Sequence, residues 1–241
     1  MAYAVALCAY LVLRRRFGDN IAAPTRWAVV AGAVAGGAIG AKLLFLFEDP
    51  QLTIHNLHNP AYLTGGKTIV GALAFGLLFV ELLKKYIGVG RSTGDLYAIP
   101  LCLGIAVGRI GCFLTGLPDN TYGTPTSLPW GVDFGDGITR HPTQLYEIAF
   151  LLVLASALYF VTRSITRENT VFKLGDAFKL FMVAYMAFRL LCDFIKPYPK
   201  VFLGLRAIQW VCLLVLLYYF SDVVRWLQAL RAHRRLSWRQ I

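Results

Sequence analysis

The chain has 241 residues, of which 57% are hydrophobic and 15% charged, and its mean hydropathy is +0.59. Soluble domains carry about 25% charged residues, so this composition excludes a disordered chain and argues strongly against an ordinary soluble domain. The formal net charge is nevertheless +11, from 24 Lys and Arg against 13 Asp and Glu. Such a basic excess belongs either to a nucleic-acid surface or to the charge that orients membrane proteins, and its placement decides between them.

Seven apolar stretches follow one another along the chain, and each predicts a helix. The first ends before Arg14 and is too short for about 30 Å of hydrocarbon, so it is either a truncated span or an interfacial segment. It has no basic start and no small-residue cleavage site, which argues against a cleaved signal peptide. The expected fold is an all-α integral membrane protein with about seven transmembrane helices. The stretches cover roughly residues 1–13, 27–47, 69–83, 96–115, 142–162, 175–195 and 203–220.

The basic residues alternate from one connection to the next. Fifteen lie after the first, third and fifth stretches and in the tail, four lie in the opposite connections, and five lie within stretches. Because Lys and Arg concentrate on the cytoplasmic side, this predicts an external N-terminus and a cytoplasmic C-terminus. We expect a single transmembrane domain over residues 1–241, an extracytoplasmic loop over 117–141 and a basic cytoplasmic tail over 221–241 that anchors to lipid. Nucleic-acid binding is disfavoured.

Ionisable residues inside the apolar stretches are costly in a membrane and mark candidate sites. In this topology most of them fall near the outer leaflet. One interpretation is a cationic pocket for a phosphate, since Arg binds phosphate through forked hydrogen bonds. The other is a set of interhelical salt bridges, in which Arg189 pairs with Asp193 and Glu147 pairs with Arg109 or Lys42. The residues at this level are Lys42, Lys67, Arg109, His141, Glu147, Arg189, Asp193, Lys196 and Arg206.

Glycines mark two further features. Gly32, Gly36 and Gly40 form a helix-packing face, and Gly104 and Gly108 form a second one that leads into Arg109. The run Gly65-Gly66-Lys67-Thr68 fails as a phosphate-binding loop because Ala61 stands where that motif requires its first glycine. It is either a turn that opens the third stretch or a flexible point at which the backbone and Lys67 approach a lipid headgroup.

The connection from Leu117 to Arg140 leads into a polar run at the start of the fifth stretch. Pro142 suits the first turn of a helix, and Gln144, Tyr146 and Glu147 follow within about 1.5 turns, at the lip of the cationic level. The cysteines and histidines are scattered without metal-ligand spacing, so neither a metal nor a cofactor is expected. The five cysteines are Cys8, Cys102, Cys112, Cys192 and Cys212.

Several motifs, taken in order, resemble the prolipoprotein diacylglyceryl transferase family over nearly the whole chain. The most specific runs from Arg140 to Glu147 and resembles the family's RHPSQLYE segment. The run from Gly108 to Phe113 resembles its GRIGNF signature, and the run from Pro125 to Val132 resembles its PTDLPWGV stretch. Two shorter runs, Gly40 to Leu43 and Phe188 to Phe194, are similar to its GARL and FRxxVEF motifs.

The resemblance implies a seven-helix enzyme of the bacterial cytoplasmic (inner) membrane, with its site facing the outer leaflet. It implies transfer of a diacylglyceryl group from phosphatidylglycerol to a lipoprotein-precursor cysteine, with release of glycerol phosphate. Arg109 and Arg189 would hold the phosphate and its developing charge, and His141 and Glu147 would organise the hydrogen bonds. The expected partners are an anionic phospholipid and a prolipoprotein signal peptide. Substrate-binding roles are expected for Lys42, Gly65, Gly66, Lys67, Gln144, Tyr146, Asp193 and Lys196.

The chain departs from the family pattern on the acceptor side. Val70 stands where the family has a histidine, a candidate base for the thiol, and Cys112, Thr115 and Leu117 replace the family's Asn, Asn and Glu. Loss of a general base costs roughly 10²–10⁴-fold unless another group substitutes. The alternatives are therefore a divergent paralogue with another acceptor, or a non-catalytic phospholipid-binding protein. A transporter is weaker, because the charges avoid the membrane midplane and no inverted repeat is visible.

Overall fold

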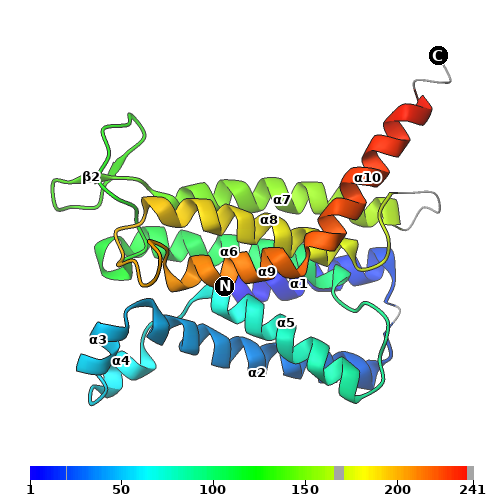
Figure 1. The fold of residues 1–241 in the computed structure, drawn as a ribbon, viewed down its shortest axis with the longest axis horizontal. Coiled ribbons are helices and arrows are strands. Elements are labelled where there is room, and N and C mark those ends of the chain that lie inside the picture. Colours follow the sequence, from blue (N-terminus) through cyan, green and yellow to red (C-terminus); the bar gives the residue numbers. More distant parts are fainter. Residues whose placement is uncertain (20, 166–170, 238–241) are drawn as a thin grey trace. The chain divides into compact units, whose positions relative to one another are not determined.

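The computed structural model describes residues 1–19, 21–165 and 171–237, and helices dominate it (Figure 1). The chain forms two compact units. Unit 1 comprises Met1–Asp19, Gly94–Tyr185 and Leu217–Ile241, and unit 2 comprises Asn20–Thr93 and Met186–Leu216. By these bounds helix α8 (Asp176–Cys192) contributes its first part to unit 1 and its last turns to unit 2.

Unit 1 is built on α6 (Asp95–Thr115), which packs against both α1 (Ala2–Phe17) and α7 (Thr143–Ile165). A Cβ on Gly104 would lie 3.2 Å from the Cβ of Ala6, so the small residue permits the close approach of α1. Among the described residues nothing lies within 4 Å of the same position on Gly108, so only the first half of this glycine pair packs a helix. The unit also includes α10 (Phe220–Ser237).

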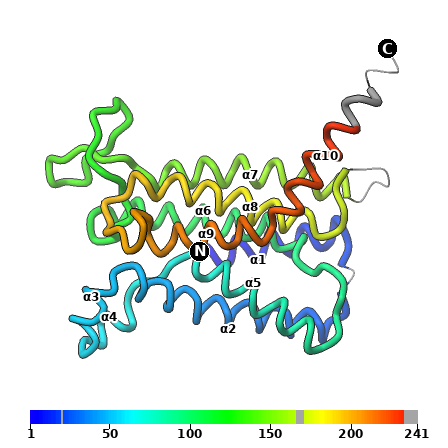
Figure 2. The backbone as a smooth tube through the Cα atoms, in the orientation of Figure 1, coloured from blue at the N-terminus to red at the C-terminus, as the bar shows by residue number. Residues whose placement is uncertain are grey.

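A short antiparallel hairpin fills the connection between α6 and α7. The 3₁₀ turn η1 (Leu117–Asp119) precedes it, and β1 (Val132–Asp133) pairs with β2 (Thr139–Arg140). The Asp133 carboxylate accepts hydrogen bonds from three successive backbone amides at residues 135–137, which fixes the turn. This loop ends directly at the start of α7 (Figure 2).

Unit 2 is built on the packing of α2 (Ala23–Glu48) against α5 (Ile69–Tyr86). A Cβ on Gly40 would lie 2.4 Å from the carbonyl oxygen of Gly71, and one on Gly36 would lie 2.6 Å from that of Phe75. No side chain fits there, which confirms the predicted glycine packing face. The unit's other elements are α3 (Pro50–His55), α4 (Pro60–Thr64), the end of α8, the 3₁₀ turn η2 (Asp193–Ile195) and most of α9 (Ala207–Tyr218).

Each predicted apolar stretch contains a helix, and the structure adds α3, α4 and α10. Three helices of the described chain, α2, α6 and α7, are long and apolar enough to cross a membrane, and α9 with α10 qualifies as one further span broken at Tyr219. Helix α8 has 17 residues and includes three charged ones, Asp176, Lys179 and Arg189. The fold is that of a mostly helical membrane protein, whereas seven crossings and the orientation of the termini stay predictions. Residues 238–241 of the predicted tail lie outside the described residues.

Candidate active site

Three helices of unit 1 bring a buried ion pair together. The Nε of Arg109, on α6, lies 2.9 Å from Oε2 of Glu147, on α7, and Tyr185, on α8, donates a 2.6 Å hydrogen bond to Oε1 of the same carboxylate. The Arg109 and Glu147 side chains are 8% and 1% exposed, and Tyr185 is fully buried. We call these three residues the Arg109 cluster. It confirms the predicted pairing of Glu147 with Arg109.

Gln144 adds an unpaired polar group beside this cluster. It lies three residues before Glu147 on α7, so the two side chains share a helix face. Gln144 is 1% exposed, yet neither its amide nitrogen nor its amide oxygen has a hydrogen-bond partner among the described residues. A buried amide left without partners costs about 1–3 kcal/mol, which identifies this position as one that a polar ligand or water would complete.

His141 belongs to a polar chain at the entrance to α7. The indole Nε1 of Trp130 donates to the Tyr146 hydroxyl at 2.9 Å, and that hydroxyl lies 3.2 Å from Nδ1 of His141. Since an indole can only donate, the Tyr146 oxygen accepts from Trp130, and its second lone pair can accept from the Nδ1 proton of His141. In that tautomer of the neutral imidazole, Nε2 carries no proton. The structure thus brings the predicted residues His141 and Tyr146 within hydrogen-bond distance of each other.

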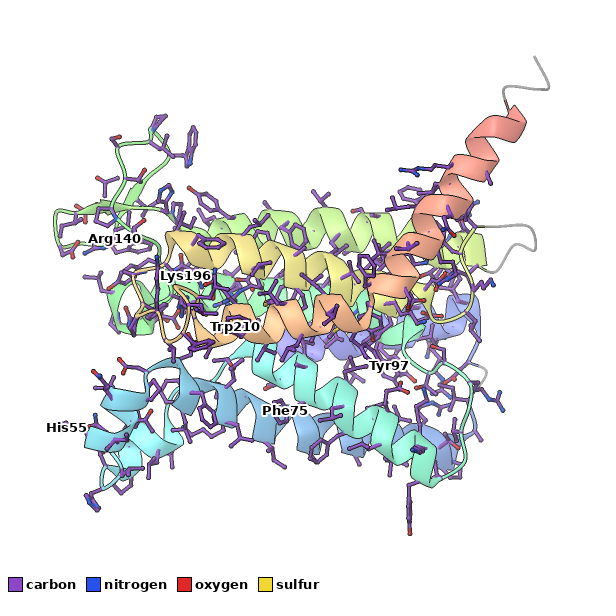
Figure 3. All side chains as sticks on the ribbon, viewed as in Figure 1. His55, Phe75, Tyr97, Arg140, Lys196 and Trp210 are labelled. Carbon is purple, nitrogen blue, oxygen red and sulfur yellow. The ribbon has the colours of Figure 1, made fainter. Side chains whose placement is uncertain are left out.

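Arg140, the first residue of the motif, holds the hairpin. Figure 3 labels Arg140 at the hairpin. Both of its terminal nitrogens lie 2.7 Å from the Asp136 carboxylate, and its guanidinium lies 4.9 Å from the ring centre of Tyr122. The guanidinium keeps the pKa of the Asp136 carboxyl below its usual value, chiefly through these hydrogen bonds. Arg140 thus shapes the loop that delivers His141.

Unit 2 contains a separate cluster of four buried charges. Arg189 donates to Oδ1 of Asp193 at 2.9 Å, and Arg206 donates to Oδ2 at 3.0 Å. Arg206 also pairs with Glu48, whose other oxygen accepts from the backbone amide of Ile208 at 2.9 Å. All four carboxylate oxygens are engaged, and two positive charges meet two negative ones. We call Glu48, Arg189, Asp193 and Arg206 the Arg189 cluster, and it confirms the predicted pairing of Arg189 with Asp193.

The loop after η2 covers the Arg189 cluster. The ring centre of Tyr198 lies 4.4 Å from the Arg206 guanidinium, and burial raises the pKa of Tyr198 to about 12. The Tyr198 hydroxyl therefore stays protonated at neutral pH. Lys196 begins this loop and is 8% exposed. The loop is packed on the ion network through an aromatic face.

Lys42, Gly65 and Gly66 meet in one turn of unit 2. The Lys42 ammonium donates to the Gly65 carbonyl at 2.5 Å and lies 4.8 Å from the ring centre of Phe45. Gly66 has a φ of +39°, and a Cβ there would fall 2.1 Å from the Phe45 ring. The glycine pair is thus a fixed turn opening α5, whereas the neighbouring Lys67 is exposed. These contacts account for Lys42 without a ligand.

Positions that depart from the family pattern do not supply a base of the expected kind. Val70 is fully buried in unit 2. In α6, Nη1 of Arg109 lies 3.8 Å from the Cys112 sulfur, and the Thr115 hydroxyl donates to the Gly111 carbonyl within the same helix. Leu117 begins η1. Among the described residues there is also no group of three or more His, Cys, Asp and Glu that could hold a metal.

Sequence reasoning overlooked two members of these clusters. Tyr185 lies one helical turn before Arg189, and that spacing could have flagged it. Glu48 directly follows the second apolar stretch, and a search for acidic residues at the same depth as the arginines would have found it. Within the two clusters Glu147, Asp193 and Glu48 pair with Arg109, Arg189 and Arg206.

Comparison with known proteins decides the family. The sequence model of prolipoprotein diacylglyceryl transferase matches residues 1–224. The chain belongs to the prolipoprotein diacylglyceryl transferase family. It is 36% identical over 185 residues to the phosphatidylglycerol–prolipoprotein diacylglyceryl transferase of Bordetella parapertussis, which covers 74% of this chain and 65% of that protein. It is also 32% identical over 192 residues to the enzyme of the same name from Nitrosomonas europaea, which covers 76% and 66%.

The chain matches only part of each relative, so the relatives' activity is not assigned to it directly. The chain spans about 65% of the length of the curated family members it matches first. A relative from Clostridium tetani, with the same printed name, is 34% identical over 175 residues, covering 69% of this chain. Family membership and a multi-pass membrane protein are established, and the activity of this chain is a matter for proposal.

Proposed function

We propose that this protein transfers a diacylglyceryl group from phosphatidylglycerol, or a similar anionic phospholipid, to the lipobox cysteine of a prolipoprotein. The main observation that supports this proposal is the buried amide of Gln144, which has no hydrogen-bond partner among the described residues and lies on the α7 face that also bears Glu147. A polar headgroup that reaches this face would complete the amide and lie beside the Arg109 guanidinium. Family membership supplies the substrate class.

The proposed step is a displacement at the glycerol carbon that bears the phosphate ester. The acceptor sulfur attacks this carbon and forms a C–S bond, the C–O bond to phosphate breaks, and glycerol phosphate leaves with the electron pair. The thiol proton passes to a protein base. Negative charge grows on the departing phosphate, so a guanidinium held nearby favours the transition state over the ground state. Arg109 takes this role, and Arg189 is the second cation proposed to act on the phosphate.

His141 is the better candidate base. Val70 cannot accept a proton, and Glu147 is engaged as an anion: Oε2 forms an ion pair with Arg109, and Oε1 accepts a hydrogen bond from Tyr185. Protonating Glu147 would remove this ion pair. The His141 imidazole is only partly buried and is oriented through Tyr146, so it can exchange its proton with solvent. Glu147 then serves to orient Arg109.

The placement proposed for this reaction is the outer face of a bacterial inner membrane. Seven crossings with an external N-terminus would bring the 117–141 hairpin and the start of α7 to that face. The loop would then meet the signal peptide after export. We propose substrate contacts by Gln144, Tyr146, Lys67 and Lys196, with Gly65, Gly66, Lys42 and Asp193 shaping their surroundings.

One assay separates this function from its alternatives. The purified protein is incubated with phosphatidylglycerol and a lipobox peptide, and both glycerol phosphate release and peptide mass are followed. A peptide heavier by one diacylglyceryl group, with equimolar glycerol phosphate, is the expected result. Release without peptide modification would indicate another acceptor, and bound lipid without release would indicate a non-catalytic lipid-binding protein.

A pair of variants tests the assignment of the base. His141→Gln is expected to lower turnover by about 10²–10⁴-fold and to remove the acid limb of the pH–rate profile. Glu147→Gln keeps a side chain of the same size but loses the ion pair, so its residual activity should retain that acid limb. An unchanged pH profile in His141→Gln would reject His141 as the base and leave the transferase assignment intact.

A further inference from the structure

An apolar groove lies on unit 1 between α6 and α7, and its lining residues are separate from those of the Arg109 cluster. It has a volume of about 400 Å³ and is lined from α6 by Ile99 and Leu103 and from α7 by residues between Leu152 and Phe160. This volume is within the range of about 300–1,000 Å³ typical of small-molecule sites. Both helices are long and apolar enough to cross a membrane. The groove is therefore open to a guest that is itself apolar, such as a lipid chain.

One end of the groove carries positive charge. The guanidinium of Arg16, at the C-terminal end of α1, lies 5.3 Å from the ring centre of Tyr159, a lining residue. Phe17 packs edge-on against the same ring at 5.9 Å. Arg163 is exposed and follows Tyr159 by four residues on α7, so it lies on the same side of that helix. The C-terminal ends of α1 and α7 thus meet there, as Figure 2 shows.

We propose that this groove is a binding site for an anionic phospholipid, distinct from the proposed catalytic site. One acyl chain lies along Leu103, Leu152 and Phe160, and the phosphate meets Arg16 and Arg163. An apolar groove with cations at one end matches the two halves of a phospholipid. A neutral apolar ligand would not use the charge, and a soluble anion would not use the channel.

The charge at this end also assigns the leaflet. Arg14, Arg15 and Arg16 end α1, and Arg14 is already paired with Asp19 at 3.1 Å. In the proposed topology this is the cytoplasmic end of unit 1, whose leaflet is negatively charged. The bound phospholipid would therefore come from the inner leaflet. It would fill the space between α6 and α7, the helices that carry Arg109 and Glu147, and so stabilise their packing.

Photo-crosslinking of the full-length protein in nanodiscs tests this site without relying on catalysis. Phosphatidylglycerol and phosphatidylcholine, each with a diazirine in an acyl chain, are compared at equal concentration, and labelled peptides are mapped. Since each basic residue near a membrane surface contributes about 1 kcal/mol towards anionic lipid, residues 152–160 should favour phosphatidylglycerol by about fivefold or more. Exposed Leu217, outside the groove, should show no such preference and serves as the internal reference.

Matched variants decide whether the groove is responsible. Arg16→Gln should lower the preference for phosphatidylglycerol about fivefold. Arg15→Gln, which removes an equal charge from the preceding residue, should keep that preference. Ser156→Phe, which fills the groove, should abolish labelling of residues 152–160, and Val153→Phe on exposed α7 surface should not. Equal losses in Arg15→Gln and Arg16→Gln, or unchanged labelling in Ser156→Phe, would overturn the proposal.

The groove and the catalytic site are separable in the same samples. Arg16→Gln should keep its turnover at saturating substrate, while Arg109→Ala should lose turnover and keep the labelling preference at residues 152–160. If the protein has no transferase activity, the labelling experiment is unaffected. Loss of the preference in Arg109→Ala would show that the labelled lipid belongs to the Arg109 site, and would reject a second site.

Discussion

The two buried charge clusters differ in what they leave unpaired. In the Arg189 cluster of unit 2, every carboxylate oxygen accepts a hydrogen bond from within the protein, and the charges balance. The Arg109 cluster of unit 1 is likewise an ion pair, but the Gln144 amide on the same helix face has no partner in the described chain. His141 and Tyr146, at the start of the helix that carries Gln144, are only partly buried.

This difference suggests a division of labour. A buried polar group without a partner is costly, so the Gln144 amide of unit 1 indicates a position completed by a ligand or by water. In unit 2 all four carboxylate oxygens are engaged, although the Nε of Arg206 has no hydrogen-bond partner among the described residues, and these bonds fix the direction of Arg189. We infer that the Arg109 cluster contacts substrate and that Glu48 and Arg206 position Arg189. The predictions below test that contrast.

The largest effect is expected in unit 2, where Arg206 pairs with two carboxylates at once. Arg206→Ala would leave both Glu48 and Asp193 partly uncompensated in a buried place, so it should cost about 3–5 kcal/mol of stability. Thermal unfolding in detergent measures this loss. The double variant Glu48→Gln/Arg206→Met removes one charge of each sign and should recover much of it. If Arg206→Ala were as stable as the wild type, Arg206 would not be compensating Glu48 and Asp193.

In unit 1 the main effect should fall on turnover. Replacing Arg109 by Ala should lower the transfer rate by about 10²–10³-fold, the usual cost of removing one donor that stabilises developing charge. Because the change also orphans Glu147, Arg109→Ala/Glu147→Gln is the control for folding: it should restore stability without restoring turnover. Recovery of activity in the double variant would mean that Arg109 serves only to neutralise Glu147.

A smaller effect is expected at Tyr185, the third member of the Arg109 cluster. Tyr185→Phe removes the hydrogen bond to Glu147 while keeping the ring, so it should cost about 1.5–3 kcal/mol of stability, as for bonds to charged groups. Turnover should fall as well, because Glu147 loses its orientation. Tyr10 is a matched control, since its buried hydroxyl has no partner among the described residues. Tyr10→Phe should be neutral, and an equal loss in both variants would dismiss the role of Tyr185.

Much of this organisation was readable in the sequence. Apolar periodicity located the helices, glycine spacing located the packing face of α2, and helical spacing located the Arg189–Asp193 pair, because each is a local property of one segment. The partners of Arg206 were not readable: Glu48 lies 158 residues away in the sequence. The same holds for Tyr185, whose hydrogen bond to Glu147 spans 38 residues.

The hairpin shows a second kind of limit. The sequence gives no sign that Arg140 has a different role from the residues that follow it in the motif. The structure assigns Arg140 to Asp136 and Tyr122 within the loop, since both contacts depend on a turn whose geometry Asp133 sets. The eight-residue run from Arg140 to Glu147 therefore contains a structural arginine beside candidate catalytic residues.

The smallest predicted effect concerns this hairpin and acid pH. Hydrogen bonds from Arg140 hold the pKa of Asp136 below its ordinary value of 3.8, so the unfolded hairpin binds this proton more readily than the folded one. The contribution of the pair is therefore complete above about pH 5, and it is lost as the pH falls below about 4 through the folded pKa. Amide-exchange protection at residues 137 and 138 should accordingly decline on acidification, after correction for intrinsic exchange. In Asp136→Asn that protection should start lower and show less change with pH. An acid-induced loss of equal size in the variant would assign the titration to a different carboxylate. It would also contradict the proposed role of Arg140 in shaping the loop before α7.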